Sequence, residues 1–219
     1  SERDALWING HSVTYAALLE KCRRIAGAID ASAAPGSPLA AVFALRSETA
    51  YAGVLGILAS GRGYVPLNPK FPVARTRRML LNSECDVVVA GEESLAALEA
   101  VVSNLGRRIT VLLPDVARDS CTFTPSDEHT WLFAEELQVH PLMTDVPPLP
   151  ADGTAYLLFT SGSTGEPKGV PVTHVNVTAY VGTMSRRYRV APTDRFSQTF
   201  DLTFDLSVHD MFLAWEAGA

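Results

Sequence analysis

The stretch AYLLFTSGSTGEPKGVPVTH, residues 155–174, is the part of the chain that decides its fold. It opens on a run of mostly apolar residues, Tyr156–Thr160, which has the length of a buried β-strand. Glycine and hydroxyl residues follow this run and lead to Lys168. Glycines let backbone N–H groups approach phosphate oxygens closely, hydroxyls donate hydrogen bonds, and a lysine adds positive charge. The stretch therefore predicts a strand followed by a phosphate-binding loop.

A serine- and glycine-rich surface turn is the alternative explanation of this loop. The density of donors, together with a lysine held by Pro167, favours phosphate binding. The chain contains neither the G-x-x-x-x-G-K-[ST] pattern of P-loops nor the G-x-G-x-x-G pattern of dinucleotide-binding folds. We therefore expect a phosphate-binding loop outside the two commonest nucleotide motifs.

Upstream of this stretch, apolar runs alternate with helical patterns, and 47% of the 219 residues are hydrophobic. Continuous Val, Ile and Leu runs between helices indicate a parallel sheet that is covered on both faces. The predicted fold class is therefore α/β, with mostly parallel sheets flanked by helices. Strands are expected within 38–45, 85–91 and 108–114, and helices within 15–30, 47–61, 73–84 and 92–106.

Three further segments have weaker patterns. Residues 5–15 predict a hairpin with Asn9-Gly10 as its turn, followed by a helix that Thr14 caps. Residues 64–72 are too rich in proline for regular structure, and residues 115–153 predict a long irregular excursion with one short helix near 131–137.

The overall charge and the cysteines limit the class of protein. A net charge of −6 argues against nucleic acid or an anionic membrane as a partner. The three cysteines, Cys22, Cys85 and Cys121, have no disulfide or metal spacing, so we expect free thiols and assign no metal ligands. No leader pattern and no apolar run of about 18 residues is present, so a soluble, cytoplasmic chain is expected.

The stretch FDLTFDLS, residues 200–207, contains two aspartates among apolar residues. Strict alternation predicts a strand here, and Ser207 then resembles the N-cap of a helix that Gly218 closes. On such a strand Asp201 and Asp205 share a face about 13 Å apart, at ~3.3 Å per residue. Only Asp205 lies at the junction between strand and helix, where ligands bind in α/β sheets. The alternative for Asp205 is a solvated acid, and Asp201 is expected to be structural or solvated.

Four stretches resemble, in order, the motifs of the adenylate-forming superfamily, which comprises adenylation domains of nonribosomal peptide synthetases, acyl- and aryl-CoA synthetases, and luciferases. They are residues 13–29, 56–75, 156–174 and 204–212. The second departs from the family pattern, because Gly63 and Asn68 stand where alanine and aspartate are usual, and we expect little consequence for the scaffold. The resemblance implies that residues 1–219 are the N-terminal portion of the large core domain.

The resemblance also implies a two-step reaction. A carboxylate attacks the α-phosphate of ATP to give an acyl-adenylate and pyrophosphate, and a phosphopantetheine thiol, on a carrier protein or on CoA, then takes the acyl group. Mg²⁺ is expected to neutralise the triphosphate, and Lys168 is the expected catalytic residue. The expected phosphate-binding residues are Thr160, Ser161, Gly162, Ser163, Thr164, Gly165 and Lys168.

In amino-acid adenylation domains a Phe-Asp-x-Ser stretch supplies the aspartate that pairs with the substrate α-ammonium, and Asp205 matches it. By the same alignment Leu206 and His209 line the side-chain pocket, although a structural histidine is an equal alternative at position 209. His174 is expected to be structural. Acyl- and aryl-CoA synthetases generally lack this acid, so such a synthetase is the alternative function; a non-catalytic binding module is a third possibility.

Family motifs downstream of Ala219 are absent from the sequence. They include the acidic residue that helps to place Mg²⁺, the ribose-binding aspartate and the small C-terminal domain with its catalytic lysine. We therefore expect a fragment that forms no adenylate alone and needs the remaining part of the adenylation domain as its partner.

Overall fold

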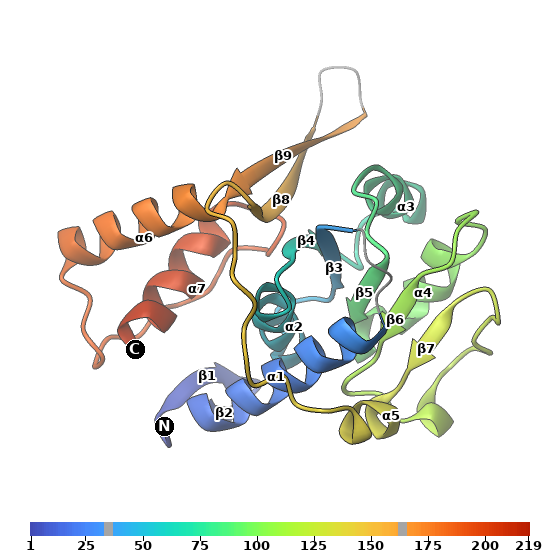
Figure 1. The fold of residues 1–219 in the computed structure, drawn as a ribbon, viewed down its shortest axis with the longest axis horizontal. Coiled ribbons are helices and arrows are strands. Elements are labelled where there is room, and N and C mark those ends of the chain that lie inside the picture. Colours follow the sequence, from blue (N-terminus) through green and yellow to red (C-terminus); the bar gives the residue numbers. More distant parts are fainter. Residues whose placement is uncertain (33–36, 162–165) are drawn as a thin grey trace.

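A central sheet of seven strands organises the computed structural model, which describes residues 1–32, 37–161 and 166–219 (Figure 1). The strand order is β7-β6-β5-β3-β4-β8-β9. Every pairing is parallel except that of β8 with β9. The strands are β3 (Leu39–Phe43), β4 (Gly63–Leu67), β5 (Val87–Ala90), β6 (Thr110–Leu112), β7 (Thr130–Leu132), β8 (Thr154–Ser161) and β9 (Pro167–Thr173). The predicted α/β class with a mostly parallel sheet is confirmed.

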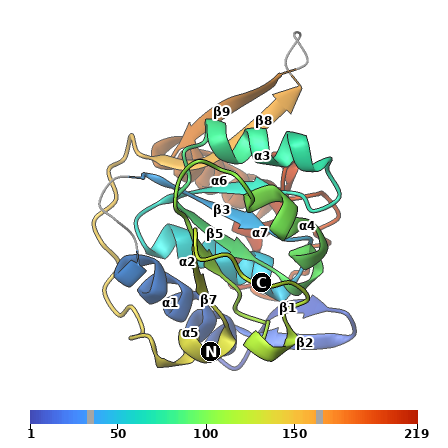
Figure 2. The ribbon, with the colours of Figure 1, turned by 90° about the vertical axis from the view of Figure 1, so that its right-hand side faces the viewer.

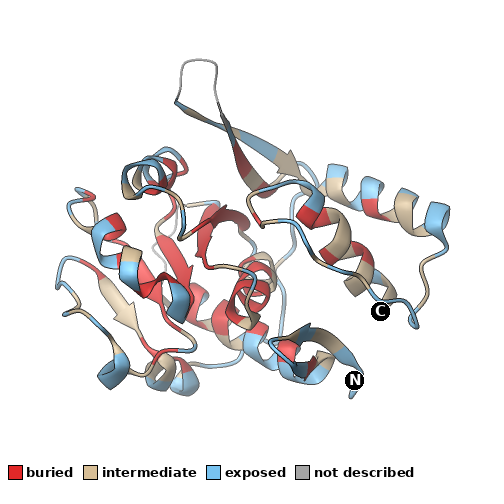
Figure 3. Cartoon of the chain, turned by 180° about the vertical axis from the view of Figure 1, so that it is seen from behind, coloured by how far each residue is buried: buried red, intermediate tan, exposed pale blue. Residues whose placement is uncertain are grey.

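Helices cover both faces of this sheet and create two cores (Figure 2). Strand β3 serves both, because Ala40 and Val42 point into one core while Ala41 and Phe43 point into the other. Figure 3 shows the buried strands between partly exposed helices. The first core contains α1 (Tyr15–Ser32), α2 (Glu48–Ala59) and α7 (Leu206–Ala217); the second contains α3 (Val73–Asn82) and α4 (Leu95–Val102).

The predicted helix and hairpin signals near the N-terminus are confirmed. Strands β1 (Asp4–Ile8) and β2 (His11–Thr14) are joined by Asn9 and Gly10, whose φ angles are +51° and +85°. The Thr14 hydroxyl accepts the N–H of Ala17 at 3.2 Å at the start of α1. Ser47 accepts the N–H of Ala50 at 3.3 Å at the start of α2. Each cap satisfies a backbone donor that the first turn of a helix leaves free.

The prediction that residues 64–72 are irregular was wrong for their first part. Strand β4 is completely buried and pairs with β3 along its whole length. The strand tolerates Pro66 because β4 pairs with β8 only at Tyr64. The backbone N–H that proline lacks is therefore not needed for a hydrogen bond to β8. Burial against two neighbouring strands outweighs the low strand propensity of proline here.

The region 115–153 also contains more structure than predicted. The short helix expected near 131–137 is present as α5 (Ala134–Val139), and the edge strand β7 precedes it. A three-residue strand has too few positions to show alternation, and it exists because it pairs with β6. Short 3₁₀ helices at Glu92–Ser94 and Arg118–Ser120 complete this half of the fold. Across the described residues, no helix is both long and apolar enough to cross a membrane.

The two helices α1 and α2 are in close contact at Gly56. A Cβ added there would lie 2.8 Å from the side chain of Ile25 and 3.0 Å from the carbonyl oxygen of Cys22. Real side chains do not tolerate such contacts, so the two helices would have to separate.

We predict that Gly56→Ala lowers the free energy of unfolding by about 1–3 kcal/mol, because overpacking a well-filled core costs this much. The measurement is urea denaturation. The matched control is Gly182→Ala in α6 (His174–Tyr188), where the nearest atom, the Arg186 Nη1, is 3.6 Å away. Equal stability of the two variants would contradict the tight contact at Gly56.

The cysteines are free thiols in different surroundings. Cys22 and Cys85 are buried, and burial raises the pKa of each thiol to about 12. Cys121 is only half-buried. Because the thiolate is the nucleophile, we predict that a thiol reagent at pH 8 modifies Cys121 in the native protein and all three cysteines in denaturant. Rapid native labelling of Cys22 or Cys85, identified by peptide mapping, would contradict this arrangement.

Candidate functional site

The hairpin of β8 and β9 carries the predicted phosphate-binding residues and extends away from the sheet (Figure 1). Thr160 lies opposite Lys168 in the ladder, its hydroxyl is 3.4 Å from the Lys168 carbonyl, and both residues are exposed. The sequence predicted a loop up to Lys168, whereas this lysine already belongs to β9. Gly162, Ser163, Thr164 and Gly165 lie outside the described residues, and for Ser161 only its place in β8 is described.

The loop end of this hairpin contacts α3. Glu166 forms an ion pair with Arg78, with 3.0 Å between the carboxylate and guanidinium atoms. Both side chains are more than half exposed, so the pair contributes little to stability. Its effect is to connect the start of β9 with the second core.

The segment before α7 is a turn, and the strand predicted for residues 200–207 is absent from it. Asp201 accepts hydrogen bonds from the backbone N–H of Thr203 at 2.9 Å and from its hydroxyl at 2.5 Å. The N–H of Phe204 donates to the carbonyl oxygen of Asp201 at 2.9 Å. An aspartate that bonds to the backbone two residues later forms a local turn that competes with a strand. The strand prediction from the alternation of apolar residues was therefore wrong. The separation of about 13 Å between the two aspartates assumed an extended strand and does not apply to a turn.

The predicted N-cap at Ser207 is also wrong. Ser207 is buried in the first turn of α7, and its hydroxyl donates to the Phe204 carbonyl oxygen at 2.7 Å. Asp205 occupies the N-cap position, but its side chain makes no capping hydrogen bond. The Asp205 carboxylate therefore stands at the positive end of a helix without being used by that helix.

The negative charge of Asp205 acts on a tyrosine of β8 and a tyrosine of α6. Burial is the main cause of the raised pKa of Tyr156, and the negative charge of Asp205 is the second. The pKa of Tyr180 is raised by burial, then by Tyr188, and then by Asp205. Among the described residues, no lysine, arginine or histidine forms an ion pair with Asp205. The site thus contains an exposed carboxylate beside two phenols.

His209 lies on the same face, one helical turn after Asp205. Its Nδ1 is 2.8 Å from the Tyr180 hydroxyl, and its ring meets Tyr180 and Tyr188 edge to face at 5.9 and 5.8 Å between ring centroids. It borders a cavity of about 340 Å³ together with Tyr188. The structure therefore brings Asp205 and His209 together between α6 and α7, whereas Leu206 is 43% exposed.

Sequence reasoning missed the tyrosines of this site. Tyr180 and Tyr188 are eight residues apart in a helical stretch, a spacing that places both on one face of α6. That spacing was the available signal. Tyr156 gave no such signal, because it reads as one more apolar residue of β8.

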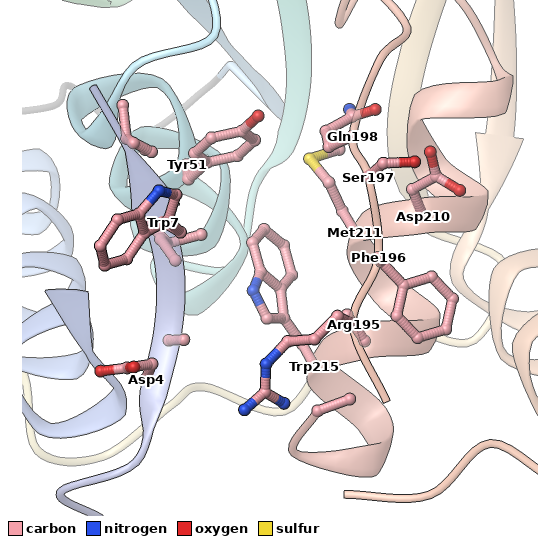
Figure 4. A pocket seen from close by; sticks show the side chains of 15 residues that line it. Asp4, Trp7, Tyr51, Arg195, Phe196, Ser197, Gln198, Asp210, Met211 and Trp215 are labelled. Atoms are coloured by element: carbon pink, nitrogen blue, oxygen red, sulfur yellow. The ribbon is translucent and has the colours of Figure 1, made fainter. Parts of the chain in front are cut away.

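A cavity of about 560 Å³ lies between β1 and α7, as shown in Figure 4. Trp7 and Tyr51 face Gln198 and Asp210 across it. None of Asp205, Leu206 and His209 lines this cavity. We therefore place the candidate site between α6 and α7, where the predicted residues converge.

The described residues contain no preformed metal cluster. Among them, no group of three or more His, Cys, Asp or Glu side chains is placed to hold a metal ion. The Mg²⁺ that the resemblance implies is an ion that proteins usually hold through one or two carboxylates together with the substrate phosphates.

Comparison with known proteins assigns this chain to a family. A family model described as AMP-binding enzyme matches residues 1–219. The chain belongs to the AMP-binding enzyme family. It is 28% identical to tyrocidine synthase 3 of Brevibacillus parabrevis over 218 residues, which cover 100% of this chain and 3% of that relative. The chain therefore spans only a small part of the length of this much larger protein.

Two solved structures are similar to this AMP-binding chain. The crystal structure of IdnL7 is 36% identical with a TM-score of 0.85, covering 100% of this chain and 41% of that one. The adenylation domain AlmE of Vibrio cholerae, in complex with glycyl-adenosine-5'-phosphate, is 25% identical with a TM-score of 0.80. That match covers 99% of this chain and 41% of AlmE. The predicted membership in the adenylate-forming superfamily, with the fold of the N-terminal part of an adenylation domain, is confirmed.

We predict that Asp205→Asn lowers the pKa of Tyr156 and Tyr180. A negative charge disfavours a nearby phenolate, so removal of the Asp205 carboxylate makes each hydroxyl easier to ionise. The measurement is a pH titration of ¹³C-labelled tyrosine by NMR, with Tyr180→Phe used for assignment. Asp194→Asn is the control, because Asp194 contributes to neither pKa. Unchanged titration in Asp205→Asn would place the carboxylate elsewhere.

Proposed function

We propose that this protein activates an amino acid as an aminoacyl-adenylate, using ATP, and transfers it to the phosphopantetheine thiol of a carrier protein. The observation that carries the proposal is the Asp205 carboxylate, which stands at the N-terminus of α7 with no cation paired to it among the described residues. Membership in the AMP-binding enzyme family supports the adenylate. The glycyl-adenosine-5'-phosphate bound by AlmE is an adenylate of an amino acid and supports the substrate class.

Asp205 binds the α-ammonium of the amino acid in this proposal. A carboxylate that meets an ammonium in a site shielded from water discriminates strongly, because a substrate without the amine leaves the charge unpaired. His209, fixed through the Tyr180 hydroxyl, borders the space for the substrate side chain. Leu206 adds an apolar surface beside them.

The hairpin of β8 and β9 supplies the phosphate-binding part. Thr160 and Lys168 stand opposite each other at the end of its two arms, and both are exposed to a ligand. Ser161, Gly162, Ser163, Thr164 and Gly165 add hydroxyl and backbone donors between them. Tyr156, beside Asp205, precedes Thr160 by four residues, which spans about 13 Å at ~3.3 Å per residue and leaves room for the substrate carboxylate between the two parts.

The reaction requires positive charge where negative charge develops. A carboxylate oxygen of the amino acid attacks the α-phosphorus of ATP, the bond from that phosphorus to the bridging oxygen breaks, and pyrophosphate leaves with the electron pair. Lys168 and the hairpin donors stabilise the leaving pyrophosphate. The chain spans 41% of IdnL7 and of AlmE, and we propose the remaining part of an adenylation domain as the source of the Mg²⁺ ligands.

A CoA synthetase for acyl or aryl acids is the alternative. Such acids have no α-amine, and Asp205 would then face them unpaired. Loading of a phosphopantetheinyl carrier protein, compared with CoA as the acceptor, separates these two functions.

The test is amino-acid-dependent exchange between ATP and pyrophosphate in the full-length protein, screened over amino acids and their des-amino analogues. We expect Asp205→Asn to lower kcat/KM for the amino acid by roughly 100-fold or more. In this proposal the bound substrate and the rest of the adenylation domain enclose the ion pair, and loss of one partner of such a buried pair costs about 3–5 kcal/mol. Asp127→Asn, at an exposed position outside the candidate site, is the control and should retain activity. Des-amino analogues that serve the wild type as well as amino acids would refute the proposed role of Asp205.

A further inference from the structure

One contact connects the sheet with the turn that carries Asp205. The side-chain nitrogen of Asn68, at the end of β4, donates to the Oδ2 of Asp201 at 2.5 Å, and the two residues are 133 positions apart. Asn68 is 9% exposed and Asp201 is half-buried, so this hydrogen bond is partly shielded from water. The structure thereby gives the asparagine at position 68 a contact that the sequence did not predict.

Neighbouring hydrogen bonds determine that Asn68 is the donor and Asp201 the acceptor of their contact. The Oδ1 of Asn68 accepts the N–H of Lys70 at 2.8 Å, so only its nitrogen is available to Asp201. The Oδ1 of Asp201 accepts from Thr203, so its Oδ2 is available to Asn68. The pair therefore requires one amide donor and one carboxylate acceptor.

The same turn is held at a second point. The Arg46 guanidinium donates to the carbonyl oxygens of Gln198 and Thr199 at 3.0 and 2.5 Å. Leu202, inside the turn, is 3% exposed. The turn and the residues before it are thus held by Asn68 and Arg46, which follow β4 and β3. Asp205 comes directly after this turn.

We propose that Asn68 is a positioning residue for the amino-acid substrate, acting through the Asp201 turn to set where the Asp205 carboxylate stands. An aspartate at position 68 would place two carboxylates 2.5 Å apart, the present distance between Asn68 and Asp201. Such a pair shares one proton or moves apart. This inference rests on the proposed function for the identity of the substrate, but the contact between Asn68 and Asp201 can be tested without it.

The reversed pair provides the decisive variant. In Asn68→Asp/Asp201→Asn, the new carboxylate accepts from Lys70 and from the new amide, whose own oxygen still accepts from Thr203. Every hydrogen bond of the network is retained with donor and acceptor exchanged. If Asn68 only filled space, Asp201→Asn would not be expected to restore the function lost in Asn68→Asp.

The experiment compares the wild type, Asn68→Asp and the reversed pair in the full-length protein. Pyrophosphate exchange gives KM for the amino acid and for ATP between pH 6 and 9. We expect Asn68→Asp to raise KM for the amino acid about 10-fold, because a misplaced charged contact weakens the binding free energy by ~1–2 kcal/mol. KM for ATP should be nearly unchanged. The loss should shrink at low pH, where a proton joins the two carboxylates, and the reversed pair should restore the wild-type KM.

Two further measurements keep the outcome unambiguous. Asn104→Asp is the matched control, because it introduces the same charge at an exposed position and should change neither KM. Hydrogen exchange of residues 199–207 should rise in Asn68→Asp and return to the wild-type rate in the reversed pair. If Asn68→Asp does not fold, the reversed pair alone must fold and keep the wild-type KM.

The inference is overturned if the reversed pair fails to restore KM for the amino acid, or if KM for ATP rises equally. Failure of the proposed function gives a different result, in which the wild type uses des-amino analogues as well as amino acids. Hydrogen exchange would still report in that case whether Asn68 holds the turn.

Discussion

Burial of β3 on both of its faces is the constraint on which the other elements depend. A strand whose residues point alternately into two cores needs helices above and below, and parallel neighbours supply them through their crossover connections. The helices α1 and α2 fill one side and α3 and α4 the other. Parallel pairing also places the carboxyl ends of β3, β4, β5 and β8 at one edge, and the segments that follow β4 and β8, Asn68 and the hairpin, are those that build the candidate site.

The position of α7 follows from the first of these cores. Val208 and Met211 are buried in it, and the Trp215 ring meets the Tyr51 ring edge to face at 6.2 Å. This packing fixes the axis of the helix and therefore the place of its N-terminus, beside β8 and α6. A carboxylate at that end remains outside the core, because an unpaired charge in an apolar interior is costly. The packing of α7 thus fixes the helix end at which the polar group of the site stands.

Local patterns predicted those elements that local forces determine. The caps at Thr14 and Ser47 and the turn at Asn9-Gly10 were correct, because each depends on neighbours within three residues. The errors at β4 and β7 have the opposite cause. Pro66 disfavours a strand locally, and only pairing with a strand more than twenty residues earlier makes it one. The strand β8 and the start of a helix close to Asp205 could be predicted from the sequence, whereas the tyrosines around Asp205 depend on how α6 packs on α7, which periodicity alone does not define.

The two Phe-Asp-Leu segments show this distinction within one octapeptide. Their local sequences are nearly identical, so no local rule separates Asp201 from Asp205. The difference comes from one distant partner and one near partner: Asp201 receives the amide of Asn68 and the two donors of Thr203. A carboxylate with three donors is held firmly and has little capacity left for a ligand. Asp205 receives no such donor from its helix and keeps its charge available. Asp201 therefore uses its carboxylate oxygens to build the turn, and the carboxylate of Asp205, which follows that turn, remains available for a ligand.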